Sequence, residues 1–221
     1  MSESNGAMPR GVIFDMDGVL VDSEPFISKA ACLMFQELGQ EVQEKDFEPF
    51  VGMGEERYLG GVAEKYGLDV ELEAIKRRTY DIYLEIIQGA LQPLAGVFDF
   101  IGRCQAGNKK IALASSADLR KVAGNLLEIG LPAERFDAFV TGNDVEHKKP
   151  SPDIFLRAAD LLGMPAEECL VVEDAVSGVA AAKAAGSRCL ALTTSFTREE
   201  LVGADYFAAD LSEAADEVLI W

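Results

Sequence analysis

The chain has a single histidine, four cysteines and one tryptophan among its 221 residues. With only His147, no chemistry that needs two histidines is available, and the neighbouring Lys148 and Lys149 indicate an exposed loop. The cysteines are far apart and form no C-x-x-C pair, which favours free buried thiols over disulfides or a zinc site. No apolar run reaches the roughly 20 residues that a transmembrane helix requires.

Basic residues are also few, because 20 Lys and Arg stand against 38 Asp and Glu, for a formal net charge of −18. Nucleic acids and anionic membranes both require a basic surface, so neither is expected as a partner. A small anionic substrate requires a local cation or positive site that offsets the carboxylates. Residues 1–9 are polar and lack the basic and apolar regions of a signal peptide, so we expect a flexible tail and a protein that stays in the cytoplasm. We also expect a monomer.

The chain does contain enough apolar sequence for a folded core, since 49% of its residues are hydrophobic and 26% charged. Its most informative stretch is residues 11–18 (GVIFDMDG), an apolar run that ends in Asp15 and Asp17. A buried parallel strand that delivers acids to the carboxyl edge of its sheet has this pattern. α/β proteins bind their ligands at that edge.

A long helical segment separates this strand from the rest of the chain. Apolar residues recur at helical spacing from Ser23 to about Leu38, and further helices are predicted at 55–66 and 70–87. Within the last of these, we expect Lys76-Arg77-Arg78 to form a solvated face. An all-helical stretch after a first strand is typical of an inserted cap. The predicted units are a tail at 1–9, an α/β core at 10–21 and 93–221, and a helical cap domain at 22–92.

Strands and helices alternate after this segment. Short apolar runs predict strands at 110–114, 138–141, 170–172, 189–192 and 206–208, and helices are predicted at 118–129, 151–162 and 177–185. Ser151 is the predicted N-cap of the second of these helices. Alternation of this kind predicts a Rossmann-like, doubly wound parallel sheet with helices on both faces.

Polar residues suited to an anion site follow or precede several of these elements. They are Ser115 and Ser116 after the strand at 110–114, Lys148 and Lys149 before the helix at 151–162, and Glu173 and Asp174 after the strand at 170–172. A hydroxyl and free N–H groups directly before a helix suit a phosphate. Each pair alone also fits a helix start or a solvated surface. Their order along one sheet edge favours a shared site.

Four ordered motifs resemble those of the haloacid dehalogenase superfamily, in its β-phosphoglucomutase-like subgroup. They are Asp15-Met16-Asp17-Gly18-Val19, Ser115, Lys149-Pro150-Ser151-Pro152-Asp153, and Glu173-Asp174 with Gly178 and Ala184-Ala185-Gly186. The likeness covers nearly all of residues 10–210 and implies the fold of that superfamily with a C1-type cap. Residues 49–62 also resemble the cap of the dehalogenase-like domain in plant suppressor-of-quenching proteins.

The resemblance implies a Mg²⁺-dependent phosphatase that hydrolyses a small phosphomonoester, such as a sugar phosphate. Asp15 is the implied nucleophile that becomes an aspartyl-phosphate, and Asp17 the implied general acid and base. Ser115 and Lys149 are expected to bind the phosphoryl oxygens, with Lys149 preferred over Lys148 because it directly precedes the proline. The implied ligands of Mg²⁺ are Asp15, the backbone carbonyl of Asp17, and Asp174 with help from Glu173.

The cap is expected to set substrate specificity. The predicted substrate-binding residues are Ser116 in the core and Gly52, Gly54, Glu55 and Arg57 in the cap. Arg57 is placed to reach a second anionic group, although an exposed helix residue explains it equally well.

Two other functions stay open at this point. A phosphosugar mutase needs cap groups that hold a distal phosphate, but the histidine and arginine of the β-phosphoglucomutase pattern align with Ile27 and Glu55, which favours net hydrolysis. A non-enzymatic module regulated by phosphorylation of Asp15 is the second alternative. Receiver domains of that kind are shorter and lack a helical insertion after the first strand.

Overall fold

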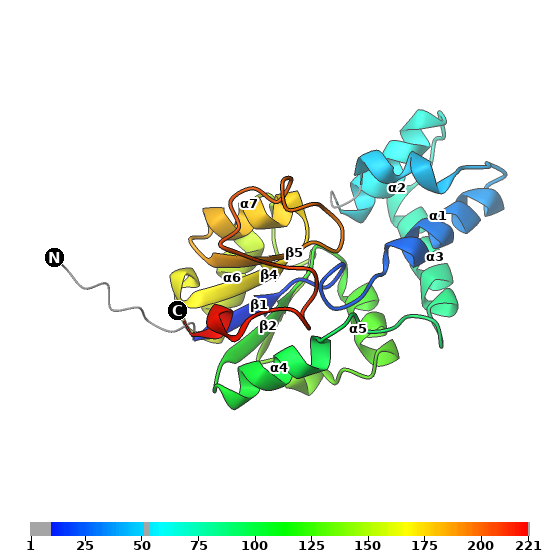
Figure 1. Ribbon diagram of the computed structural model, residues 1–221. Helices are drawn as coiled ribbons and strands as arrows, with labels where there is room; N and C mark the ends of the chain where they lie inside the picture. The colour runs from blue at the N-terminus through cyan, green and yellow to red at the C-terminus, as the bar shows by residue number, and fades with distance from the viewer. Residues whose placement is uncertain (1–9, 51–53, 221) are drawn as a thin grey trace.

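The computed structural model describes residues 10–50 and 54–220 (Figure 1). The strands are β1 (Gly11–Phe14), β2 (Lys110–Ala114), β3 (Ala138–Val140), β4 (Cys169–Glu173), β5 (Arg188–Leu192) and β6 (Tyr206–Ala208). They form one six-stranded parallel sheet in the order β3-β2-β1-β4-β5-β6. This confirms the predicted fold class. The expected tail at 1–9 lies outside the described residues.

Helices cover both faces of the sheet (Figure 1). α6 (Asp153–Leu162) and α7 (Val176–Ala184) lie on the face to which Ile13 points, whereas α4 (Val97–Ala106) and α5 (Leu119–Glu128) lie on the face of Val12 and Phe14. Phe14 packs edge-to-face on Phe100 of α4, with ring centroids 5.9 Å apart. Burial on both faces explains why the strands are almost continuously hydrophobic in sequence.

Two details of this α/β part differ from the sequence-based prediction. α4 was not predicted, although its buried residues Val97, Phe100, Ile101 and Cys104 have helical spacing. Ser151 does not cap α6, because its hydroxyl donates a hydrogen bond of 2.7 Å to the Asp153 side chain instead. The acid in the first turn of the helix therefore binds the hydroxyl that was expected to bind the backbone.

Three helices follow β1 and lie to one side of the sheet (Figure 1). They are α1 (Glu24–Glu37), α2 (Glu55–Lys65) and α3 (Leu72–Ile86), with short 3₁₀ turns at Glu44–Asp46 and Glu48–Phe50. We call this segment the helical insertion. Val21 and Pro93 form an isolated antiparallel bridge, so the chain leaves and re-enters the α/β part at one place. The division into a cap domain and a core domain stays a prediction.

The insertion contacts the α/β part through α3 and α5. Lys76 of α3 is buried and pairs with Asp118 at 3.0 Å, so the prediction that it belongs to a solvated face was wrong. The Tyr83 hydroxyl donates to Asn125 Oδ1 at 2.5 Å. One side of α3 therefore faces protein, which explains why a lysine there is enclosed.

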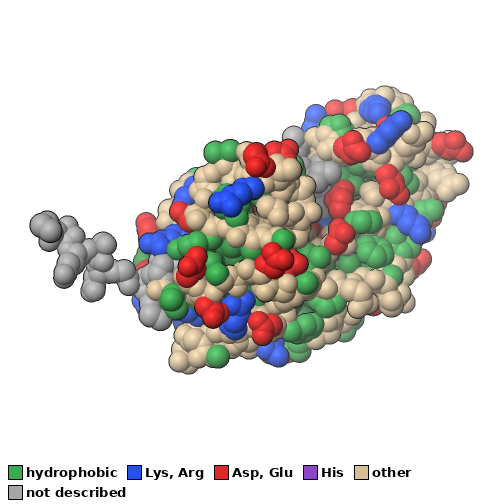
Figure 2. Space-filling model, in the orientation of Figure 1, with side chains coloured by type: hydrophobic (Ala, Val, Ile, Leu, Met, Phe, Trp, Pro, Cys, Tyr) green, Lys and Arg blue, Asp and Glu red, His purple; other side chains and the backbone are tan. Residues whose placement is uncertain are grey.

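The surface agrees with the acidic composition. Asp and Glu side chains are spread over the helical insertion and the α/β part on the face in Figure 2. The four cysteines are free thiols, as expected, and three of them are buried. Among the residues that the structure describes, no helix is both long and apolar enough to cross a membrane.

Candidate active site

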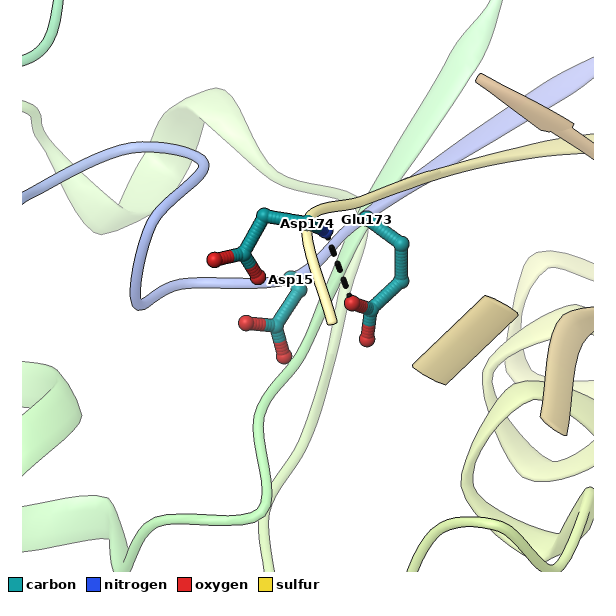
Figure 3. A group of neighbouring side chains, drawn as sticks. All are labelled: Asp15, Glu173 and Asp174. Atoms are coloured by element: carbon teal, nitrogen blue, oxygen red, sulfur yellow. Dashed lines mark hydrogen bonds between the residues drawn. The ribbon is translucent and has the colours of Figure 1, made fainter. Parts of the chain in front are cut away.

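Three acids at the carboxyl ends of β1 and β4 meet at one edge of the sheet (Figure 3): Asp15 follows β1, Glu173 is the last residue of β4, and Asp174 comes next. Asp15, Glu173 and Asp174 each offer one carboxylate oxygen, and these atoms lie within 4.8 Å of one another. Phe14 pairs with Val172 in the sheet, so the residues after the two strands emerge side by side. The strand order reverses between β1 and β4, and ligand sites of α/β folds lie at such a switch point.

Lys149 is the cation of this cluster. Its Nζ donates to Asp15 Oδ1 at 2.5 Å and to Glu173 Oε1 at 2.6 Å, and only 5% of its side chain is exposed. Lys148 points elsewhere, because its side chain lies against Gly54 of the insertion. The structure therefore brings Lys149, and not Lys148, to the acids.

Charge is unbalanced in this buried site. Burial raises the pKa of Asp15 to about 7, although Lys149 acts in the opposite direction. Burial and the neighbouring charges of Glu173 and Asp15 raise the pKa of Asp174 well above its usual range. Burial tends to lower the pKa of Lys149, but Asp15 and Glu173 outweigh it and raise that pKa. Three acids around one lysine leave a negative excess that a bound cation would stabilise.

The donor set fits a magnesium ion, because it consists of carboxylate oxygens only. Glu173 Oε2 accepts hydrogen bonds from the backbone N–H groups of Asp174 and Ala175, and Oε1 accepts from Lys149. Both oxygens of Glu173 are thus engaged, which makes Asp15 and Asp174 the better direct ligands. The part predicted for the Asp17 backbone carbonyl stays a prediction.

Two glycines allow the acids to lie this close to the backbone. A β-carbon on Gly18 would overlap the carboxylate of Asp174, and one on Gly178 would overlap that of Glu173. Gly18 also has a φ of +74°, a conformation that favours glycine. The glycine of the fourth motif, Gly178, therefore leaves the space that the Glu173 carboxylate occupies.

Asp17 lies beside the three-acid cluster with a different set of partners. The Ser23 hydroxyl donates to its Oδ1, and Lys121 Nζ donates to its Oδ2 at 3.0 Å. Lys121 belongs to α5, and its side chain is only 5% exposed. Lys121 was not predicted from the sequence, because nothing in the spacing of the motifs points to it.

Ser115 and Ser116 follow β2, the strand next to β1 in the sheet. Ser115 is buried, and its Oγ accepts a hydrogen bond from the Ala117 N–H at 3.1 Å. Lys149 Nζ approaches the carbonyl oxygen of Ala114 at 3.5 Å, which places the end of β2 next to the acids. Ser116 is half-buried.

Three of the cap residues predicted to bind substrate lie at the start of α2. Gly54 precedes α2, and Glu55 is the first residue of that helix. Arg57 is exposed, pairs with Glu64 at 3.1 Å and lies over the Phe50 ring. Gly52 lies outside the described residues. Contact of any of these residues with substrate stays a prediction.

The chain is similar to known proteins in both sequence and fold. A family profile for haloacid dehalogenase-like hydrolases matches residues 9–186. The chain is 45% identical over 191 residues to the chloroplastic protein SUPPRESSOR OF QUENCHING 1 of Arabidopsis thaliana, which confirms the likeness to those plant proteins. That match includes 84% of this chain but spans only 18% of the plant protein. Because this relative is a chloroplastic protein, the cytoplasmic location expected for the chain stays a prediction.

Two other similar proteins match over most of their length. The chain is 33% identical over 177 residues to a phosphorylated carbohydrates phosphatase of Thermotoga maritima, covering 80% of this chain and 82% of that one. A solved structure of mutant CbbY from Rhodobacter sphaeroides, in complex with xylulose-(1,5)bisphosphate, superimposes with a TM-score of 0.88. It is 27% identical and covers 97% of this chain and all (100%) of that one.

Proposed function

The chain belongs to the haloacid dehalogenase-like hydrolases and is a phosphatase, and from that premise we propose that it hydrolyses a small sugar phosphate through an aspartyl-phosphate on Asp15. The observation that carries this proposal is the contact of Asp15 with Lys149, beside Glu173 and Asp174, at the switch point of the sheet. The substrate class is supported by the phosphorylated carbohydrates named for the Thermotoga relative and by the bisphosphate in the CbbY structure.

In the first half of the reaction, the Asp15 carboxylate attacks phosphorus and the bond from phosphorus to the leaving oxygen breaks. Asp17 gives that oxygen a proton, so the product leaves as a neutral alcohol. Lys149 and Ser115 bind the phosphoryl oxygens, on which charge develops.

In the second half, a water molecule attacks the phosphorus of the aspartyl-phosphate. Asp17, now a carboxylate, accepts a proton from that water, and the bond between phosphorus and the Asp15 oxygen breaks. Inorganic phosphate leaves, and both acids return to their starting states.

Asp15 and Asp174 would hold Mg²⁺, with the backbone carbonyl of Asp17, and Glu173 would orient the site through Lys149 and its backbone hydrogen bonds. When bound, Mg²⁺ offsets the repulsion between these carboxylates and the phosphate and stabilises negative charge. This fits the raised pKa values of Asp15 and Asp174, because a cation would favour their ionised forms.

A panel of phosphorylated sugars and related phosphomonoesters tests the proposal, with inorganic phosphate as the readout. We expect turnover of at least one sugar phosphate in Mg²⁺, loss of turnover in excess chelator, and recovery when Mg²⁺ is restored. Zn²⁺ should not be required. Full activity in chelator would refute the metal site, and no turnover of any phosphomonoester would favour a phospho-aspartate module over an enzyme.

A further inference from the structure

We propose that Lys121 is a positioning residue that holds Asp17 in place for its proton transfers, an inference that rests on the proposed function. Lys121 Nζ donates to Asp17 Oδ2 at 3.0 Å, and the Ser23 hydroxyl donates to Oδ1. Both oxygens of the acid are therefore bound by side chains from different elements. Ser23 directly precedes α1, whereas Lys121 comes from α5.

The ammonium group of Lys121 is held in a largely dry environment. Its side chain is 5% exposed, while that of Asp17 is 36% exposed. A buried lysine requires a partner, and an acid at hydrogen-bond distance stabilises its charge. Charge-assisted hydrogen bonds are shorter and stronger than neutral ones. Together with the Ser23 contact to the other oxygen, this hydrogen bond restricts the rotation of the Asp17 carboxylate.

The helical insertion also contacts Lys121. Its Nζ lies 5.7 Å from the centre of the Tyr83 ring of α3, a distance at which the ring attracts a cation. The Tyr83 hydroxyl donates to Asn125 Oδ1, and Asn125 lies one helical turn after Lys121. Asn125 is fully buried. These contacts fix the position of the ammonium group, and with it that of Asp17.

Loss of Lys121 should affect only the steps in which Asp17 moves a proton. An alkyl leaving group needs protonation when its bond to phosphorus breaks, whereas p-nitrophenolate leaves without a proton. The first turnover of p-nitrophenyl phosphate therefore does not depend on the position of the Asp17 carboxylate. Hydrolysis of the aspartyl-phosphate does depend on it, whatever the substrate was.

The experiment compares Lys121→Met with wild type in rapid-quench and steady-state assays. Methionine keeps an unbranched chain of similar length but has no charge and no N–H donor. We expect the first-turnover rate with an alkyl phosphomonoester that wild type hydrolyses to fall at least about 10-fold, within the range of general acid catalysis. The first-turnover rate of p-nitrophenolate release should stay within about 2-fold of the wild-type rate. The steady-state kcat for p-nitrophenyl phosphate should fall, because hydrolysis of the aspartyl-phosphate becomes slower.

Arg120→Met is the matched control, because Arg120 lies on the same helix and pairs with Asp81 of the insertion, without contact to Asp17. It removes a cation and a contact between α3 and α5, and it should leave the ratio of the two first-turnover rates unchanged. If the methionine variant does not fold, Lys121→Gln replaces it in the experiment. Because glutamine keeps an N–H donor, this variant should show the same selective loss of rate with a smaller fold-change.

The outcomes separate this inference from the proposed function. Equal losses for the alkyl and aryl substrates, or no loss for either, in a folded Lys121 variant would overturn the positioning role while wild type remains active. An inactive wild type would instead refute the phosphatase assignment.

Discussion

The carboxylate of Glu173 occupies the space that a side chain on Gly178 would fill. This carboxylate cannot move freely, because Lys149 and two backbone N–H groups bind it. We therefore expect Gly178→Ala to displace Glu173 and to lower kcat/KM at least about 10-fold, with weaker Mg²⁺ binding in a titration. A loss of about 1.4 kcal/mol in stabilisation of the transition state corresponds to that factor.

Gly102→Ala is the control for this variant. Gly102 also lies within a helix, α4, but nothing lies within 4 Å of a β-carbon built there. Alanine in a helix is favoured over glycine by about 1 kcal/mol, so this variant should keep its activity and gain stability. Normal Mg²⁺ binding and turnover in Gly178→Ala would contradict the role given to Glu173.

Asp15→Asn should reduce phosphate release by at least about 10³-fold while the protein stays folded, because an amide is neither an anionic nucleophile nor a good metal ligand. Circular dichroism and thermal unfolding check the fold, and phosphate release measures the activity. Asp22→Asn changes an exposed acid of the same segment and should remain active. Near-normal turnover by the folded Asp15→Asn variant would refute the assignment of Asp15 as the nucleophile.

Net hydrolysis, rather than isomerisation, is expected from the residues of the insertion. Ile27, which aligns with the histidine of the mutase pattern, is 4% exposed in the core of the protein and offers no polar group. A mutase must hold its aspartyl-phosphate against water until the sugar phosphate has turned around. We expect inorganic phosphate from a monoester and little glucose 6-phosphate from β-glucose 1-phosphate. Efficient isomerisation primed by a bisphosphate, without matching phosphate release, would show a mutase.

Asp46 should contribute to stability in a pH-dependent way. Hydrogen bonds from Lys65 and Tyr66, both at 2.6 Å, and from the Gln43 backbone hold its pKa below the usual range. Asp46→Asn should lower the free energy of unfolding by about 1–3 kcal/mol at neutral pH. A lowered pKa stabilises the folded state above the unfolded-state value of about 3.9, and this contribution is lost as the pH falls through the lower folded-state value.

Urea unfolding from pH 7 to pH 3 measures this difference. The gap between wild type and Asp46→Asn should narrow below about pH 4, because wild type loses the contribution in that range. Asp69→Asn, at an exposed acid between α2 and α3, should change stability little at any pH. A gap that does not depend on pH would show that Asp46 acts without its charge.

The sheet and the acids at its edge were predictable because both depend on local sequence. Apolar runs that end in polar residues predict strands, and parallel strands bring their ends to one edge whatever the loops do. The burial of Lys121 and Lys76 was not predictable. Lys121 and Asp17 are 104 residues apart, and Lys76 meets Asp118 only because α3 packs on α5. Burial of a charge depends on such a distant partner, which no local pattern encodes.

The bridge between Val21 and Pro93 has a consequence for how proteins of this architecture diversify. A segment that leaves and returns at one point can change in length and shape without straining the strands on either side. Because we expect the insertion to set substrate specificity, substrate choice would evolve in the segment between these residues while the reaction chemistry at the sheet edge is kept. A segment exchanged between relatives would have to match only the two neighbouring positions where it joins the α/β part, Val21 and Pro93.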